Sequence, residues 1–407
     1  MNQWILALWM GWRLWRSSLT QAVRFILRTG IAVIAISITV IVLATAIVDG
    51  FKDNIYNNLF LLQGHLQIRS YSASARSLEP PPIQRNKNVE EWLRNNKLVK
   101  FFTPFIMKPA LLTFNKRLEG VVVEAQDSIL PEMVEQLLEE GRWATSGTEI
   151  VISKTLARKL NIHIGNKVRV FFSYRPLRVK EFTVVGIYHT GLKEYDDVIV
   201  FMPLSTVQMI LGWDELMVSG YKIYLTDWMV ESVVQEELLE IVPFEFYVFN
   251  NRELNPNLFD WLNLHETNKM VLIGLLIIVS VVNLFSVLIT FLLERTPMIA
   301  MLSAIGATAG LIRRLLVAIG IWLLLVGTFI GNVVALALAL IQIKFKLIKL
   351  PEEAYYVPYV PLKLDPFNIF ITNLGVVFWV VALLLIASMF YKLRTPSEAL
   401  RWGQLRR

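Results

Sequence analysis

The chain has 407 residues, of which 55% are hydrophobic and only 18% are charged, and its mean hydropathy is +0.51. This composition excludes an ordinary soluble globule and indicates an integral membrane protein. The net charge of +7 does not favour nucleic-acid binding, because the arginines and lysines concentrate beside the apolar runs, where membrane orientation explains them. The absence of cysteine excludes disulfides and thiolate metal sites.

Residues 1–24 combine tryptophans and arginines in a pattern typical of an amphipathic helix at the membrane interface. The pattern is carried by Trp4, Trp9, Trp12, Trp15, Arg13 and Arg16. The basic start, apolar run and cleavage site of a signal peptide are not found in this stretch. Residues 25–49 follow as the first predicted transmembrane helix. Because Arg24 and Arg28 border it on the amino-terminal side, we expect the amino terminus in the cytoplasm.

Residues 50–267 are mixed in composition and are predicted to form an α+β domain of two modules outside the membrane. Strands are predicted at residues 98–105, 110–114, 120–124, 149–152, 167–172, 182–188, 198–201, 221–225 and 244–249. Helices are predicted at residues 89–95, 131–140, 153–160, 205–211 and 229–239, with Ser153 and Ser205 as N-caps.

Three more transmembrane helices are predicted, each long enough to cross a bilayer, which takes about 20 apolar residues. They lie at residues 268–293, 315–343 and 367–391, and they leave an inner loop at 294–314, an outer loop at 344–366 and a cytoplasmic tail at 392–407. The fold class is therefore a four-span α-helical membrane protein with a large periplasmic α+β domain inserted between spans 1 and 2.

The apolar runs of these spans contain no Asp, Glu, Lys, Arg or His, the residues that mark ion and proton pathways within membranes. A proton-driven transporter is therefore disfavoured. Asn283 and Asn332 are the notable polar residues, and we expect them to form hydrogen bonds between helices. The sequence has no phosphate-binding G-x-x-x-x-G-K-[ST] loop, and its four histidines lack metal-ligand spacing. No catalytic residue, metal site or cofactor is predicted in this chain.

The inner loop at 294–314 has arginines at both ends, which places it in the cytoplasm. Inside it, Met298, Ile299, Met301, Leu302 and Ile305 form an apolar face at helical spacing, and Gly306 ends the run. This pattern predicts a short amphipathic helix. Such a helix either lies on the lipid headgroups or docks into a cytoplasmic partner.

The run ERTPMIAMLSAIGAT resembles the cytoplasmic coupling helix of the MacB/FtsX-like ABC permeases, and in particular of the lipoprotein-releasing LolC/LolE branch. Pro297, Met298 and Ala300 depart from the commonest form of the pattern, which leaves the apolar face intact. The resemblance implies that an ATPase contacts this segment. The residues assigned to that contact are Glu294, Arg295, Ile299, Met301, Leu302, Ala304, Ile305, Gly306 and Ala307.

The resemblance extends over nearly the whole chain. It includes EIVISKTLARKLNIHIGNKVRVFF, FTVVGIYHTGLKEYDDVIVFMPLSTVQMIL, LPEEAYYVPYVPLKLDP and the tail RTPSEALRW. Residues 49–68 resemble the family's exit from its first span, a helix that continues beyond the membrane and then a strand. In the family a second module is inserted into the first, which corresponds here to about residues 146–212.

The function implied is that of a permease subunit of an inner-membrane ABC complex, in which ATP and Mg are bound by a separate ATPase. The complex extracts lipoproteins and passes them to a periplasmic chaperone by ATP-driven mechanotransmission. Its implied partners are the cytoplasmic ATPase, a second permease subunit in a homo- or heterodimer, the chaperone and the lipoprotein. Two alternatives remain open: another MacB/FtsX-like permease that exports amphiphiles or regulates cell-wall hydrolases, and a membrane-anchored binding protein without transport activity.

The resemblance also implies two further sites. The hairpin tip with Arg175, Pro176 and Arg178 corresponds to a chaperone-binding hook, although an ordinary turn would hold the same residue types. Lipoprotein acyl chains are expected to enter between the first span of one permease and the second span of its mate. The residues assigned to acyl contact are Val40, Leu43, Ala44, Ile47, Val48, Met270 and Ile273. The alternative for each is plain contact with membrane lipid.

Overall fold

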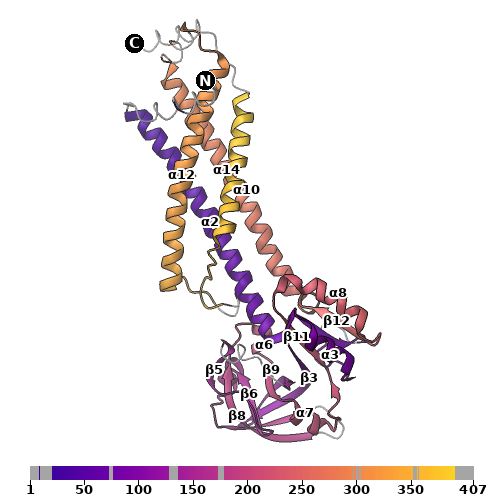
Figure 1. The fold of residues 1–407 in the computed structure, drawn as a ribbon. Helices are drawn as coiled ribbons and strands as arrows, with labels where there is room; N and C mark the ends of the chain where they lie inside the picture. Colours follow the sequence, from indigo (N-terminus) through magenta and orange to yellow (C-terminus); the bar gives the residue numbers. More distant parts are fainter. Residues whose placement is uncertain are drawn as a thin grey trace. The chain divides into compact units, whose positions relative to one another are not determined.

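The computed structural model describes residues 9, 21–72, 77–127, 136–172, 178–296, 298, 301, 304–351, 355 and 357–389 (Figure 1). The chain divides into two compact units. The first, which we call the helical unit, comprises Met1–Phe51, Asn263–Ile348 and Val360–Arg407. The second, the sheet unit, comprises Lys52–Leu262 and Lys349–Tyr359.

Four helices of the described chain are long and apolar enough to cross a membrane, which confirms the four predicted spans. They are α2 (Gln21–Gln63), α10 (Pro256–Glu294), α12 (Ala309–Phe345) and α14 (Pro366–Met389). The first two continue well beyond the apolar runs, and α2 alone has 43 residues, or about 64 Å at 1.5 Å per residue. The helix–strand exit from the first span is also confirmed, because β1 (Leu66–Ser70) follows α2 directly.

Small residues let the spans approach closely. A Cβ atom at Gly327 would lie 2.6 Å from Ile34 Cγ2, and one at Gly331 would lie 2.6 Å from the carbonyl oxygen of Ala35. Thr39 Oγ1 donates a hydrogen bond to the carbonyl oxygen of Gly331 at 3.0 Å. The two glycines are four residues apart on one face of α12, the spacing that brings membrane helices into backbone contact.

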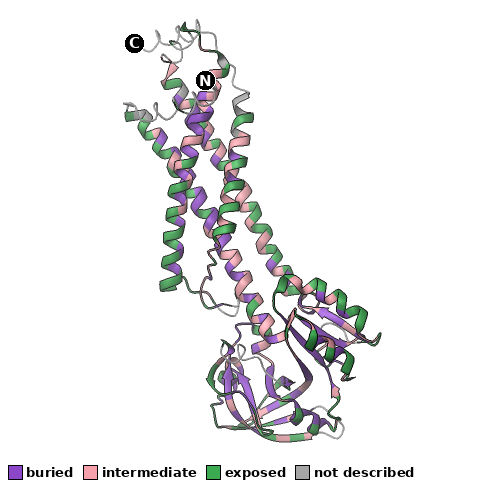
Figure 2. Cartoon of the chain, viewed as in Figure 1, coloured by how far each residue is buried: buried purple, intermediate pink, exposed green. Residues whose placement is uncertain are grey.

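The two span asparagines bond between helices as predicted. The amides of Asn332 on α12 and Asn373 on α14 exchange hydrogen bonds of 3.2 and 2.9 Å. Asn283 Nδ2 on α10 donates to the carbonyl oxygen of Gly30 on α2 at 3.4 Å. Away from these contacts the spans expose apolar side chains, such as Phe370 and Phe378 of α14, the pattern of helices that face lipid (Figure 2).

The sheet unit is built on a ten-stranded sheet with the order β12-β1-β11-β3-β4-β9-β6-β8-β5, in which β7 pairs with both β3 and β8. The other strands are β3 (Val99–Phe114), β4 (Arg117–Gln126), β5 (Leu138–Gly141), β6 (Glu149–Ser153), β7 (Lys167–Phe172), β8 (Arg178–Tyr188), β9 (Ile199–Pro203), β11 (Gly220–Leu225) and β12 (Phe246–Asn250). Because β7 links β3 to β8, six strands, β3-β4-β9-β6-β8-β7, close into a ring. Two short strands, β2 (Ile83–Gln84) and β10 (Met217–Val218), pair separately.

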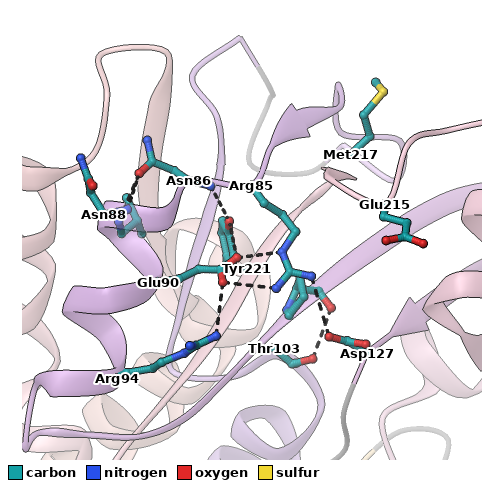
Figure 3. A network of polar contacts seen from close by, with 12 residues as sticks. Arg85, Asn86, Asn88, Glu90, Arg94, Thr103, Asp127, Glu215, Met217 and Tyr221 are labelled. Atoms are coloured by element: carbon teal, nitrogen blue, oxygen red, sulfur yellow. Dashed lines mark hydrogen bonds and ion pairs between the residues drawn. The ribbon is translucent and has the colours of Figure 1, made fainter.

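The shorter helices of the sheet unit are α3 (Lys87–Asn95), α5 (Lys154–Leu160), α6 (Lys193–Asp196), α7 (Leu204–Leu211), η1 (Trp228–Val230), α8 (Glu231–Ile241) and α9 (Asn251–Leu254). Ser153 caps α5 as predicted, since its Oγ accepts a hydrogen bond from the Leu156 amide at 3.0 Å. Polar contacts fix α3 on the sheet (Figure 3). Glu90 accepts from Arg85 at 2.8 and 3.2 Å and from the Tyr221 hydroxyl at 3.1 Å.

Three local predictions were wrong. Val99–Phe114 form the single strand β3 instead of two. Pro109 pairs in register with Val122 of β4, and on the other side of β3 it lies between the stretches that pair with β11 and β7, so its missing N–H breaks neither of those two ladders. Leu138–Gly141 pairs with β8 as strand β5 and does not end a helix, while 128–135 lie outside the described residues. Ser205 is not an N-cap, because α7 already begins at Leu204. The two-module division with an insertion at 146–212 stays a prediction.

Candidate functional site

The segment between α10 and α12 has helical conformation at four of its described residues and a turn at its end. Thr296, Met298, Met301 and Ala304 have helical conformation, and the Ile305 amide donates to the Met301 carbonyl at 3.2 Å. Gly306 ends the turn with φ +101°, a conformation that favours glycine. Thr308 then caps α12 by accepting from the Leu311 amide at 3.3 Å. Ile299 and Leu302 lie outside the described residues.

This segment presents large apolar side chains to solvent. Met301 is 66% exposed and Ile305 is 80% exposed. Glu294, Ala304 and Gly306 are also exposed, whereas Arg295 and Ala307 are half-buried. Burial of two such apolar side chains would contribute about 1.5–3 kcal/mol each. Two large apolar side chains are thus exposed on one short connecting segment between α10 and α12.

The positions assigned to acyl contact differ in exposure. Val40 and Met270 are exposed, and Leu43, Ala44, Ile47, Val48 and Ile273 are half-buried. Leu43 and Ile273 both pack against the hydrophobic core of the helical unit. The structure therefore leaves apolar surface on both α2 and α10, but it does not distinguish acyl contact from lipid contact.

A polar cluster that sequence reasoning missed lies where these apolar runs end. Lys269 Nζ lies 3.5 Å from Asp49 Oδ1 and 2.8 Å from Glu266 Oε1. Asn368 Nδ2 of α14 donates to Asp49 Oδ2 at 3.4 Å. The only signal in the sequence is that Asp49 and Lys269 each border an apolar run. The cluster ties one end of three spans together.

The hairpin tip lies largely outside the described residues, which exclude Arg175 and Pro176. Arg178 begins β8, and its Nη1 donates a hydrogen bond to the carbonyl oxygen of Ile210 in the last turn of α7. This contact gives Arg178 a structural role. The chaperone contact stays a prediction.

The sheet unit holds the ends of the two long helices in one hydrogen-bonded triangle, which we call the helix junction. It consists of Gln63, the last residue of α2, Asn255, the residue before α10, and Tyr195 of α6. The Tyr195 hydroxyl accepts from Gln63 Nε2 and donates to Asn255 Oδ1 at 2.7 Å. Asn255 Nδ2 closes the triangle by donating to Gln63 Oε1 at 2.8 Å.

Further contacts fix the end of α2, whose last carbonyl groups have no partner within the helix. Lys222 Nζ donates to the carbonyl oxygen of Leu62, and the Tyr224 hydroxyl donates to that of Leu61 at 3.2 Å. Asn58 Nδ2 donates to the Thr190 carbonyl at 2.8 Å. Alongside, the rings of Tyr56 on α2 and Phe259 on α10 stack with centroids 5.4 Å apart. These contacts anchor both helices in the sheet unit.

Charged groups are buried beside the junction. Lys222 and Glu124 form an ion pair with side chains 1% and 4% exposed, and Arg69 is 3% exposed. Burial lowers the pKa of Lys222, against the opposing attraction of Glu124. The positive charge of Lys222 lies next to the carboxyl end of α2, where it interacts favourably with the helix dipole. Burial also lowers the pKa of Arg69 and the charge of Glu124 opposes that shift, so a second cation lies near the same carboxylate.

The GLKEYDD phrase, residues 191–197, was only part of the family resemblance in the sequence. In the structure it forms a loop that includes the short helix α6 and therefore carries Tyr195. Asp196 is buried and accepts hydrogen bonds from the Thr190 and Gly191 amides at 3.2 and 3.1 Å and from Thr190 Oγ1 at 2.9 Å. Its own carbonyl accepts from Ser153 Oγ at the end of β6. Sequence reasoning missed this role because an aspartate in such a charged phrase is normally exposed, whereas Asp196 is buried, and because Ser153 is distant in the chain. Among the residues that the structure describes, no group of three potential ligands for a metal ion is found.

Comparisons with known proteins agree with this arrangement. Residues 31–229 match the family model of the MacB-like periplasmic core domain, and residues 270–397 match that of the FtsX-like permease C-terminal region. The lipoprotein-releasing system transmembrane protein LolC of Xylella fastidiosa (strain 9a5c) is 25% identical over 403 residues, which cover 93% of this chain and 94% of that protein.

Two other similarities are to LolE and MacB. The lipoprotein-releasing system transmembrane protein LolE of Haemophilus influenzae is 22% identical over 382 residues, which cover 88% of each chain. The crystal structure of the periplasmic region of MacB from Actinobacillus actinomycetemcomitans is 16% identical with a TM-score of 0.35, and the match covers 47% of this chain and 91% of that one.

Proposed function

This chain belongs to the MacB/FtsX-like permeases, and we propose that it is the permease subunit of an ABC complex that extracts lipoproteins from the inner membrane. In this proposal a second permease and a cytoplasmic ATPase complete the complex, and a periplasmic chaperone accepts the lipoprotein. The sheet unit then lies in the periplasm, and both termini lie in the cytoplasm. ATP and Mg are bound by the ATPase and not by this chain.

The observation that carries the proposal is the exposed apolar segment between α10 and α12. Met301 and Ile305 are 66% and 80% exposed on a short helical element with a span on either side. Isolated exposed apolar residues need no explanation, but two on one short connecting helix favour a partner. We propose that this partner is the ATPase, and the match to LolC and LolE relatives along most of the chain supports this choice.

The proposed mechanism is mechanotransmission. The ATPase moves the segment at 294–307, and the long helices α2 and α10 carry the motion to the sheet unit. Both helices are continuous from an apolar run to the helix junction. In this proposal acyl chains leave the bilayer sideways, between the spans. A CH₂ group gains about 0.8 kcal/mol in lipid or in an apolar pocket alike, so an apolar pocket alone is nearly neutral toward extraction. The bias toward extraction must therefore come from ATP through the sheet unit.

The test is Ile305→Glu in the full-length protein, coexpressed with the ATPase. Docking would bury a charge without a partner, at a cost of about 3–5 kcal/mol, so we expect copurification of the ATPase and lipoprotein-stimulated ATP hydrolysis to be lost. Phe244→Glu is the matched control, because Phe244 is 89% exposed but lies in the sheet unit. Unchanged stimulated hydrolysis in Ile305→Glu would refute the docking. A wild-type chain that binds no ATPase would instead favour a membrane-anchored binding protein.

A further inference from the structure

The hydrogen bonds of the helix junction link the ends of the two long helices to each other, which the packing of the sheet unit alone does not require. Its three side chains come from three separate elements, and each makes a hydrogen bond to both of the others. Gln63 is the last residue of α2 and Asn255 immediately precedes α10, so each lies at the helix end that enters the sheet unit. A shift of either helix along its axis therefore changes at least one of the three bonds.

We infer that Tyr195 is a positioning residue, the pin that ties the ends of α2 and α10 to each other and to the loop at 190–197. This inference rests on the proposed function, and it names the place where helix motion enters the sheet unit. The relevant motion is a displacement of either helix driven from the opposite end. In this structure the hydrogen bonds of Tyr195 hold the ends of α2 and α10 at fixed positions relative to each other.

The loop that carries Tyr195 is rigid enough to pass on such a displacement. Asp196, the next residue, is buried and accepts from two backbone amides and the Thr190 hydroxyl. Its carbonyl accepts from Ser153 Oγ, which joins the loop to β6 in the ring of strands. The Asn58 amide also bonds to the Thr190 carbonyl. The loop is thus held from α2, from β6 and from within.

The hydroxyl group remains a donor under all ordinary conditions. Burial raises the pKa of Tyr195 well above its usual value. Its proton therefore stays in the bond to Asn255 Oδ1 throughout the neutral range. A phenyl ring at this position would keep the packing but could join neither helix end.

The experiment uses the full-length complex with its ATPase in proteoliposomes and a dye-labelled triacylated lipoprotein as probe. Tyr195→Phe removes only the hydroxyl. Tyr188→Phe is the matched control, because the buried Tyr188 hydroxyl donates at 2.8 Å to the carbonyl of Ile199, a residue of β9 and not of either long helix. We expect lipoprotein released per ATP hydrolysed to fall about tenfold in Tyr195→Phe and to change less than twofold in Tyr188→Phe. Basal ATP hydrolysis should be unchanged in both.

A purely structural role would lower stability in both variants and leave the release per ATP equal, which would overturn the inference. Hydrogen exchange supplies a readout that needs no lipoprotein. The amides at 60–64 and 256–262 should exchange faster in Tyr195→Phe than in Tyr188→Phe, and equal exchange would also overturn the inference. If the wild type releases no lipoprotein while this difference in exchange is present, the proposed function fails and the pin stands.

A rescue experiment completes the test. The chain has no cysteine, so Gln63→Cys with Asn255→Cys places a unique thiol pair at the two helix ends. In the Tyr195→Phe background, joining these thiols with a short bis-maleimide should restore at least half of the release per ATP. Failure of the crosslinked protein to recover, with the crosslink verified by mass spectrometry, would contradict the pin.

Discussion

We predict that substitution of the two partners of the buried ion pair beside the helix junction destabilises the sheet unit to different extents. Lys222, Glu124 and Arg69 are all nearly inaccessible, and both cations lie over the ring of Phe105, at 5.6 and 5.7 Å from its centroid. The carboxylate of Glu124 also accepts from Gln126 Nε2 at 2.5 Å. Glu124→Gln leaves two buried cations without that carboxylate, whereas Lys222→Met leaves one cation and one carboxylate.

The number of buried charges left without a partner sets the expected loss of stability in each variant. Removing one partner of a buried ion pair costs about 3–5 kcal/mol when the other is left uncompensated, which is the situation in Glu124→Gln. In Lys222→Met the charge of Arg69 still balances Glu124, so the main loss is the hydrogen bond to the Leu62 carbonyl. An unsatisfied buried acceptor costs about 1–3 kcal/mol. We therefore expect Glu124→Gln to be the more destabilising change by about 2 kcal/mol.

The assay is pulse proteolysis of the full-length protein in detergent across a urea gradient, which reports unfolding of the sheet unit. Arg85→Met serves as a control for a half-buried ion pair in the same unit, and it should cost about 1 kcal/mol. The reasoning is refuted if Lys222→Met destabilises the sheet unit as much as Glu124→Gln does. That result would mean that Arg69 does not share the carboxylate.

Two further predictions concern pH and the lipid path. Burial lowers the pKa of His65 from 6.5 to about 4. The stability that neutral His65 contributes is therefore complete above pH 6.5, and about 3 kcal/mol of it is lost as the pH falls toward 4. Burial raises the pKa of Glu231 from 4.5 to about 7, which gives the opposite slope, with stability lost as the pH rises from 4.5 to 7. Urea midpoints should therefore vary little with pH in the wild type and fall with acidification in Glu231→Gln, and a flat profile in that variant would contradict the assignment. In the spans, Ala44→Trp should block lipoprotein binding while basal ATP hydrolysis continues, and a photocrosslinker at Ile47 should capture lipoprotein before ATP is added and not afterwards; absence of capture from residue 40 through 48 in an active complex would place the entry gate elsewhere.

The spans were predictable because their signal is local. Apolar runs and bordering arginines identify transmembrane helices without knowledge of the rest of the fold. Asn332 could be expected to find a partner on another helix, but the sequence did not identify Asn373. The apolar face at 298–305 likewise predicted a short helix, and Met298, Met301 and Ala304 have helical conformation. In each case the periodic pattern carried the information.

The helix junction could not be predicted, because its information is not local. Gln63, Tyr195 and Asn255 are separated by 132 and 60 residues along the chain. Lys222 lies in the strand GYKIYL, where an alternating pattern would point a lysine toward solvent, yet it is buried with Glu124. The continuity of β3 was missed for a similar reason, since residues 106–109, which the prediction left between two strands, pair with β4. Tertiary contacts decide all three.

The closed ring of six strands has a consequence for how partners can bind the sheet unit. In a closed ring each strand has a neighbour on both sides, so the ring offers few unpaired backbone groups to an extended peptide. Along the described sheet, the ends of the strand order are β12 and β5. A partner protein that contacts the ring itself must therefore be recognised through side chains and loops. Within the ten-stranded sheet, recognition by strand addition is confined to those two edges.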